Sequence, residues 1–224
     1  MKKTVKRRKV KKKPIIFLLI IIALLAFAVL YVFNFHITNI YIIGNTVYTD
    51  QEIIDKSGLK NYPRTFNNNE LIIKKRLEKD EIIKKVDVTK KNLFREVYIK
   101  IYENKPLFIY DNKVVLTNGT STTKDIEVPT LINEVTDKKV YKHLLKQLPK
   151  INDKIYNRIS EIKYDPNDKD YNRFIMTMND GNYVYITLRK IERINNYIDI
   201  ISAFEGKKGI LYLDSGEYFE VFGG

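Results

Sequence analysis

The residues best suited to chemistry are Ser160 and Lys163, which match the S-x-x-K spacing of a serine nucleophile paired with a lysine. This pairing needs a helix, which places both side chains on one face. The surrounding RISEIKY instead alternates like a strand, and a strand sends residues three apart to opposite faces. Residues 110–112 and 208–209 only loosely resemble the companion motifs, and 110–112 stand on the wrong side of the serine. The match therefore predicts no transpeptidase-type site.

Other catalytic or metal-binding patterns are also missing from the sequence. His36 and His143 are its two histidines, and neither belongs to a metal-ligand pattern. Without cysteine, the chain can form no disulfide, thiolate metal site or cysteine nucleophile. We also find no glycine-rich phosphate loop. We predict no catalytic residue, no metal and no cofactor, and therefore a binding or scaffolding protein rather than an enzyme.

The positive charge is concentrated at the start of the chain. Residues 1–13 hold nine of the 40 Lys and Arg and none of the 27 Asp and Glu. Such a tail can bind nucleic acid, but residues 15–33 follow it without a charge, a glycine or a proline. A helix over these nineteen residues is about 28 Å long, close to the roughly 30 Å of a hydrocarbon core. We predict a cytoplasmic tail over 1–13 and a transmembrane helix over 14–34.

A cleaved signal peptide is the alternative interpretation of this segment. Ala26 and Ala28 supply the small-x-small spacing of a cleavage site. The five residues after them, Val29 to Phe33, are still apolar, whereas a cleavage region is normally polar. We therefore expect a permanent anchor with the N-terminus inside, a single-pass type II arrangement with most of the chain extracytoplasmic. In that location nucleic acid is not an expected partner.

The first part of the external chain predicts the order strand, helix, helix, strand, strand over residues 35–103. Residues 36–43 alternate like a strand and end at a Gly-Asn turn. Thr49 and Glu52 have capping-box spacing, so a helix is expected from Asp50 to a stop at Gly58. A second cap is expected at residues 67–70. The inward side of the helix that follows is predicted to consist of Leu71, Ile72 and Leu77.

The remaining residues, 104–224, predict a β-rich α+β domain. Hairpin turns are expected at Asp111-Asn112 and Asp180-Gly181. An amphipathic helix is predicted over 137–148, and a second helix over 190–204. The inward positions of this second helix are predicted to be Ile191, Ile194, Ile198 and Ile201. Residues 209–222 are expected to close the domain as a final strand or a strand pair.

Over its whole length the chain resembles the FtsQ/DivIB family of bacterial division proteins. The basic tail, the anchor, ITNIYIIGNTVYTDQEIIDKSGL and LFREVYIKIYENKPLFIY carry this resemblance. It implies a POTRA domain over 35–103 and the family's β domain over 104–224. It also implies a non-enzymatic divisome scaffold in the cell membrane at the division septum. The short tail departs from the pattern, so we expect no cytoplasmic domain.

The resemblance also implies partners, namely small bitopic coiled-coil division proteins of the FtsL and DivIC/FtsB types, and septal wall synthases. The chain would link the bitopic proteins and help to regulate septal peptidoglycan synthesis. A terminal strand at a sheet edge could bind a partner segment by β-augmentation, and a proline at position 219 would then weaken binding. Alternatively, the aromatic residues there only close the core. By match to the family's terminal-strand region, the candidate partner-binding residues are Tyr212, Leu213, Ser215, Tyr218 and Phe219.

Two other functions stay open at this point. One is a POTRA-containing envelope export component, which would need a transmembrane barrel after the POTRA domain. We expect none, because 224 residues leave no room for it. The other is a generic membrane-anchored surface-binding protein, for which we find no wall-binding signature. Localisation at the septum would distinguish the division role from both.

Overall fold

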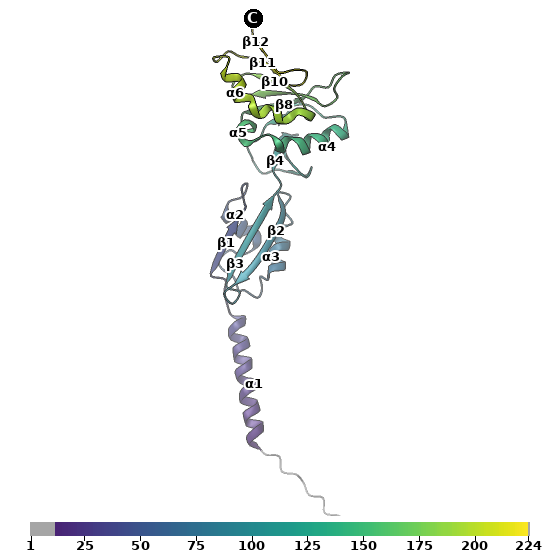
Figure 1. Ribbon diagram of the computed structural model, residues 1–224. Helices are drawn as coiled ribbons and strands as arrows, with labels where there is room; N and C mark the ends of the chain where they lie inside the picture. The colour runs from purple at the N-terminus through teal and green to yellow at the C-terminus, as the bar shows by residue number, and fades with distance from the viewer. Residues whose placement is uncertain (1–11, 224) are drawn as a thin grey trace, which may run out of the picture. The chain divides into compact units, whose positions relative to one another are not determined.

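The computed structural model describes residues 12–223, and their contacts divide the chain into two units (Figure 1). The first unit contains the residues before Glu78 together with residues 86–101. The second contains residues 78–85 and the chain from Tyr102 onward. Of the predicted cytoplasmic tail, residues 1–11 lie outside the described part of the chain. The predicted boundary at residue 103 remains a prediction.

The first helix, α1, runs from Lys12 to Phe33 and has the properties of a transmembrane segment. Its 22 residues give a length of about 33 Å. None of its residues is buried, and its most apolar 18-residue window has a mean hydropathy of 3.3. By length and composition the helix can cross a membrane. It overlaps the predicted segment 14–34.

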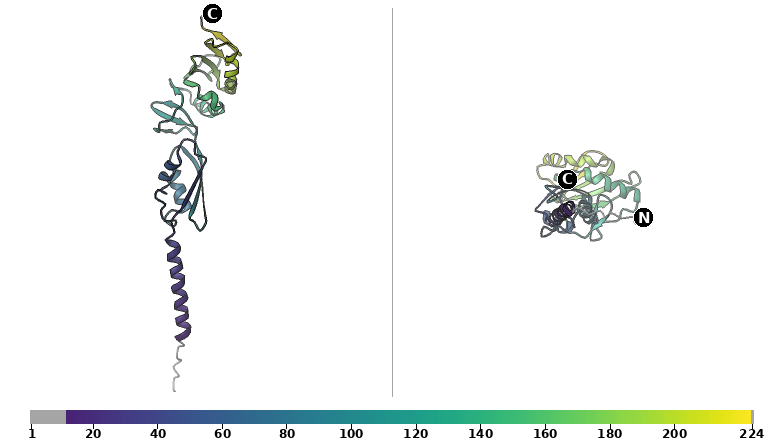
Figure 2. Two further views of the ribbon diagram at one scale, coloured as in Figure 1. Left: turned by 90° about the vertical axis from the view of Figure 1, so that its left-hand side faces the viewer. Right: turned by 90° about the horizontal axis from the view of Figure 1, so that it is seen from below.

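The rest of the first unit is a three-stranded sheet with two helices on one face, seen edge-on in the left view of Figure 2. The sheet order is β1-β3-β2, with β1 parallel to β3 and Asn39 opposite Glu96. The predicted order of strand, helix, helix, strand, strand is confirmed. The elements after α1 are β1 (Asn39–Ile43), α2 (Asp50–Ser57), α3 (Glu70–Leu77), β2 (Ile83–Lys91) and β3 (Glu96–Glu103).

The helix ends confirm one prediction and correct another. Thr49 and Glu52 form the capping box of α2, which ends at Gly58 in the left-handed region with φ 74°. At α3 the cap is Asn69, whose side-chain oxygen accepts the backbone N–H of Ile72 at 2.9 Å. Asn69 lies within the predicted span 67–70. The helix itself begins at Glu70, later than a cap at the first residue of that span would place it. Ile73 and Leu77 are its buried positions, and the prediction of Leu71 as inward-facing was wrong.

The second unit is built on a nine-stranded sheet of order β12-β11-β10-β9-β8-β7-β4-β5-β6. Both predicted hairpin turns are confirmed. Asp111 and Asn112 have φ values of 49° and 57°, and Gly181 has φ 89°. The strands are β4 (Pro106–Tyr110), β5 (Lys113–Leu116), β6 (Ser121–Thr122), β7 (Thr130–Leu131), β8 (Ile159–Tyr164), β9 (Arg173–Met178), β10 (Tyr183–Thr187), β11 (Gly209–Tyr212) and β12 (Tyr218–Val221).

Helical segments cover the sheet of the second unit and close its core. They are α4 (Lys138–Gln147), η1 (Leu148–Lys150), α5 (Asp153–Tyr156), η2 (Leu188–Asn196) and α6 (Tyr197–Ser202). The single helix predicted over 190–204 is instead a 3₁₀ segment followed by a short α-helix. A 3₁₀ turn repeats every three residues, so Leu188, Ile191 and Ile194 are buried in η2. Tyr197 is buried at the start of α6. Ile198 and Ile201 pack only partly against the core.

The chain from η2 to β12 decides the arrangement at one end of this sheet. Strand β10 is followed by η2 and α6, and this crossover returns the chain to form β11 parallel to β10. Strand β12 then folds back antiparallel to β11. Residues 209–222 thus form a strand pair, the second of the two arrangements predicted.

Candidate functional site

Strand β12 forms one edge of the nine-stranded sheet, so one side of its backbone faces no other strand of residues 12–223. Just beyond β11, the backbone N–H of Leu213 donates to the carbonyl of Tyr185 at 2.8 Å, toward β10. Just beyond β12, the N–H of Phe222 donates to the carbonyl of Lys208 at 2.9 Å. In an antiparallel pair the hydrogen-bonded positions alternate. The even-numbered residues of β11 and β12 therefore bond to each other.

The same alternation identifies the backbone groups at the free edge. Phe219 and Val221 stand opposite Leu211 and Gly209 at the non-bonded positions of the β11–β12 pair. Their N–H and C=O groups consequently point away from β11. A partner segment in extended conformation could add a strand here by bonding to these groups.

The structure brings together only some of the five predicted residues. The rings of Tyr212 and Tyr218 stack with centroids 4.5 Å apart, and Tyr218 is half exposed. Ser215 is exposed in the turn between the strands. The Phe219 ring lies 4.5 Å from that of Phe204 and is half-buried. Leu213 is fully buried in the core, and its backbone N–H already donates to the carbonyl of Tyr185.

Two residues that sequence reasoning missed extend this tyrosine pair across the sheet. The Tyr185 ring stacks on Tyr212 at 5.2 Å, and the Arg173 guanidinium lies 4.4 Å above the Tyr185 ring. Cation–π and stacking contacts of this kind each add a fraction of a kcal/mol or more. The alternating tyrosines of NYVYITL were the signal that could have indicated this ladder, which ends at Tyr218 on the sheet edge.

An ion pair holds the turn before β12 in place. The Nε of Arg173 donates to the Asp214 carboxylate at 2.8 Å, and its Nη1 donates to Asp165. The Lys190 ammonium donates to the backbone carbonyl of Asp214 at 3.2 Å. Burial raises the pKa of the Asp214 carboxyl, but the hydrogen bonds from Arg173 and Ser215 outweigh it and leave this pKa below its usual range.

This ion pair gives the unit a stability that depends on pH. Because the pKa of Asp214 is lower in the folded than in the unfolded chain, the stabilisation is complete above the unfolded value of about 3.9 and is lost as pH falls through the folded value. We expect Asp214→Asn to lower the free energy of unfolding by about 1.5 kcal/mol at pH 7. In urea unfolding, the difference in free energy of unfolding between the wild type and Asp214→Asn should narrow toward pH 3. A gap that stays constant across this range would contradict the assignment.

Comparison with known proteins identifies the family. The family model for the POTRA domain of FtsQ type matches residues 35–104. Cell division protein DivIB of Bacillus subtilis is 31% identical over 198 residues, covering 84% of this chain and 74% of that protein. This chain belongs to the DivIB family. The DivIB of Geobacillus kaustophilus is 28% identical over 188 residues, covering 79% of this chain and 71% of the relative.

A solved structure is also similar to this DivIB-family chain. It is the major extracytoplasmic domain of the trans isomer of DivIB from Geobacillus stearothermophilus, with 23% identity and a TM-score of 0.38. The match covers 46% of this chain and 96% of that one. The family assignment depends on the sequence relatives. It confirms the POTRA domain followed by a mixed α+β region, and it assigns the chain a role in cell division.

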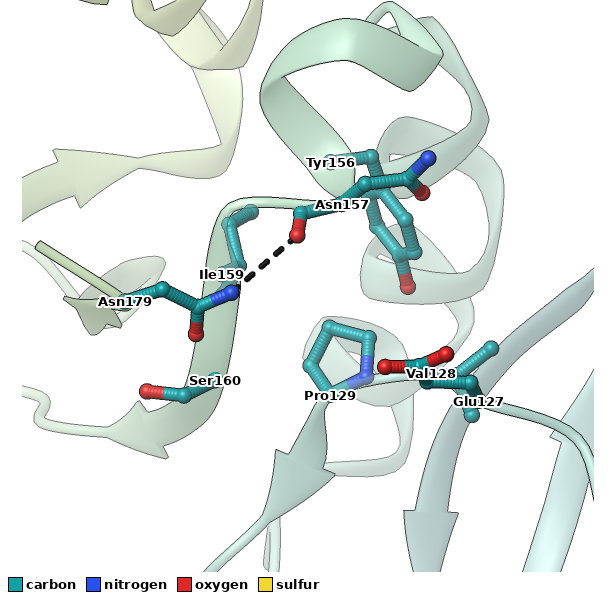
Figure 3. A pocket seen from close by; sticks show the side chains of 8 residues that line it. All are labelled: Glu127, Val128, Pro129, Tyr156, Asn157, Ile159, Ser160 and Asn179. Atoms are coloured by element: carbon teal, nitrogen blue, oxygen red, sulfur yellow. Dashed lines mark hydrogen bonds between the residues drawn. The ribbon is translucent and has the colours of Figure 1, made fainter.

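A cavity of about 400 Å³ in the second unit of this DivIB-family protein was the other candidate site (Figure 3). Asn179 donates to the backbone carbonyl of Asn157 at 3.2 Å across its wall. Tyr156 donates to the carbonyl of Leu107, and burial raises the pKa of its hydroxyl, so it stays neutral. These contacts are structural. The cavity residues are Glu127, Val128, Pro129, Tyr156, Asn157, Ile159, Ser160 and Asn179.

Ser160 also lines this cavity. It lies on strand β8, as the alternation predicted, and donates its hydroxyl to the carbonyl of Thr177 at 3.0 Å. Lys163 lies three residues further along the same strand and is exposed. Within residues 12–223 no cluster of His, Cys, Asp or Glu could hold a metal ion. The sheet edge at β12 is therefore the candidate functional site.

Proposed function

We propose that this chain is a non-enzymatic scaffold of the division machinery. It links small bitopic coiled-coil proteins of the FtsL and DivIC/FtsB types and helps to regulate septal peptidoglycan synthesis. The free edge of β12, with outward backbone groups at Phe219 and Val221, carries the proposal. Such an edge can bind a partner strand through its main chain.

The tyrosine ladder supports this function by adding side-chain contacts to the backbone pairing. A partner strand beside β12 would lie next to the half-exposed ring of Tyr218, the last member of the ladder. The carboxylate of Glu220 accepts the Tyr212 hydroxyl at 3.1 Å on the same face. A partner strand that places an aromatic or basic residue opposite Tyr218 fits this surface best.

The proposed arrangement in the cell follows from α1. The helix crosses the cell membrane once with the N-terminus inside, and the POTRA domain (35–103) and β domain (104–224) are extracytoplasmic at the division septum. The apolar length of α1 and membership of the DivIB family support this topology.

A proline at the sheet edge tests the binding mode. Phe219→Pro would also remove a ring that packs on Phe204, whereas Val221 has an equally outward N–H and no such stacking. We expect Val221→Pro to weaken partner binding about tenfold, because it deletes a donor and crowds the incoming strand. The tagged full-length chain is purified from native membranes in mild detergent, and small bitopic proteins are counted by mass spectrometry.

Val221→Ala is the matched control, because it removes the side chain and keeps the N–H. We expect partner recovery with the wild type and Val221→Ala, and loss with a folded Val221→Pro variant. Equal recovery with both variants would keep the function but move the interface to another surface. Recovery of export components in place of division proteins would overturn the function itself.

A further inference from the structure

Within the first unit, the loop before α3 contacts the end of α1. The Phe66 ring stacks on that of Phe33, the last residue of α1, with centroids 4.3 Å apart and planes at 24°. The N–H of Thr38 donates to the carbonyl of Arg95 at 2.8 Å, which places the β2–β3 turn at the same end. The two loops at this end are called the membrane-proximal rim, defined as residues 60–66 and 91–95.

The length of α1 sets the depth of this rim. The nineteen apolar residues 15–33 cover about 28 Å of a hydrocarbon core of roughly 30 Å, so Phe33 lies at its outer boundary. A ring stacked on Phe33 lies at nearly the same level. The rim therefore stands at the height of the lipid headgroups and not in bulk water.

The rim exposes large apolar side chains. Leu93 is 72% exposed, Phe94 55% and Tyr62 52%. All three have positive φ, of 55°, 64° and 50°. A left-handed conformation costs about 1 kcal/mol or more at each residue with a side chain, and these exposed side chains gain little by burial inside the folded chain. Apolar groups held in this way indicate a contact outside the protein.

The charge of the rim and its flanks has one sign. Residues 60–69 and 90–95 contain five Lys and Arg and no Asp or Glu. Glu70 and Glu96 border these segments. Glu70 accepts the backbone N–H of Lys90 at 2.8 Å, and Glu96 accepts the Tyr98 hydroxyl at 3.1 Å. Lys91 and Arg95 flank the apolar tip and are exposed. A basic ring around exposed aromatic and aliphatic side chains matches an anionic membrane interface.

We propose that the membrane-proximal rim binds the anionic phospholipid headgroups of the leaflet from which α1 emerges, with Leu93 and Phe94 inserted at the interface. The inference rests on α1 crossing the membrane, as proposed above. It gives the POTRA domain a second attachment, which restricts its tilt over the bilayer. Continuity with α1 and charge complementarity favour lipid over a protein occupant.

Spin labels at single cysteines test the proposal in the full-length protein, because the native chain contains no cysteine. The variant Leu93→Cys carries the label on the rim. Ile43→Cys is the control, since Ile43 is 59% exposed on the three-stranded sheet and lies away from the rim. It pairs with Lys100 of β3, which is about 17 Å along the strand direction from Arg95. Leu25→Cys in α1 reports insertion of the anchor. The nanodiscs contain phosphatidylglycerol and phosphatidylcholine, or phosphatidylcholine alone.

The Leu93 label should be protected from a water-soluble nickel chelate in the anionic nanodiscs, while the Ile43 label stays accessible. Replacing Lys91 by Gln should lower the ratio of docked to undocked rim about fivefold. Equal accessibility at 93 and 43, with the Leu25 label in the bilayer, overturns the lipid contact and leaves the anchor intact. An accessible Leu25 label overturns the anchor. Protection at 93 only after a bitopic partner is added would assign the rim to protein and overturn the proposal.

Discussion

Gly209→Ala is expected to detach β12 from β11 and to weaken partner binding about thirtyfold. A Cβ at Gly209 would lie deep inside van der Waals contact with the Glu220 carbonyl oxygen and 2.8 Å from Cζ of Phe219. Both atoms belong to β12, so the strand must move. Overpacking of this kind costs about 2 kcal/mol, which corresponds to the expected loss of affinity. The measurement is hydrogen exchange over residues 218–222, together with partner recovery.

The same methyl group at Gly206 provides the control. No atom outside its own neighbourhood lies within 4 Å of a Cβ there, and the only cost is the positive φ of 81°. Gly206→Ala should therefore leave exchange over 218–222 and partner recovery unchanged, with a small loss of stability. If Gly209→Ala shows wild-type exchange at β12, the pairing of these two strands is not as described. Lost β12 protection with full partner recovery would contradict the edge as the interface.

Asn182→Ala is expected to lower the free energy of unfolding of the second unit by about 3 kcal/mol. The Asn182 side chain is fully buried and makes three hydrogen bonds. Its amide group donates to the Tyr197 hydroxyl at 2.9 Å and to Asp180 at 3.0 Å, and its oxygen accepts the Gly209 N–H at 2.9 Å. Truncation leaves a buried N–H without its partner at the start of β11. Urea unfolding followed by circular dichroism measures the change.

Asn179 lies in the same hairpin turn and provides the control. Its replacement shows what the loss of an exposed asparagine costs at this turn. Its side chain is exposed and donates one hydrogen bond, to Asn157 at 3.2 Å. Asn179→Ala should change the free energy of unfolding by only about 0.5 kcal/mol. A loss at Asn182 no greater than that at Asn179 would mean that the buried network contributes little to the β10–β11 junction.

Local patterns were sufficient to predict much of the fold. The capping box at Thr49 and the glycine stop at Gly58 placed α2, because both signals act within one or two turns of the chain. Hairpins at 111–112 and 180–181 were predictable for the same reason. The inward face of α3 could not be predicted in this way. The prediction used only the positions of apolar residues, whereas the start of the helix is set by the cap at Asn69.

The candidate site was likewise predictable from the sequence only in part. Its location in the closing strands came from the family resemblance, and the apolar character of residues 209–222 agrees with it. The roles of individual residues needed the structure. Leu213 and Tyr218 look equivalent in sequence, but one fills the core and the other borders the edge. Arg173 was missed because it is 41 residues from Asp214, and no local signal pairs them.

The sequence by itself determined the anchor, the order of the elements in the first unit and the lack of a plausible catalytic pattern. Each depends on residue type and short-range spacing, which act before the chain folds. Tertiary structure alone decided that β12 is a free edge, that Phe219 and Val221 direct their backbone outward, and that loops thirty residues apart form one basic and apolar rim. These properties depend on strand order and register, which form only when segments distant in the chain pack together.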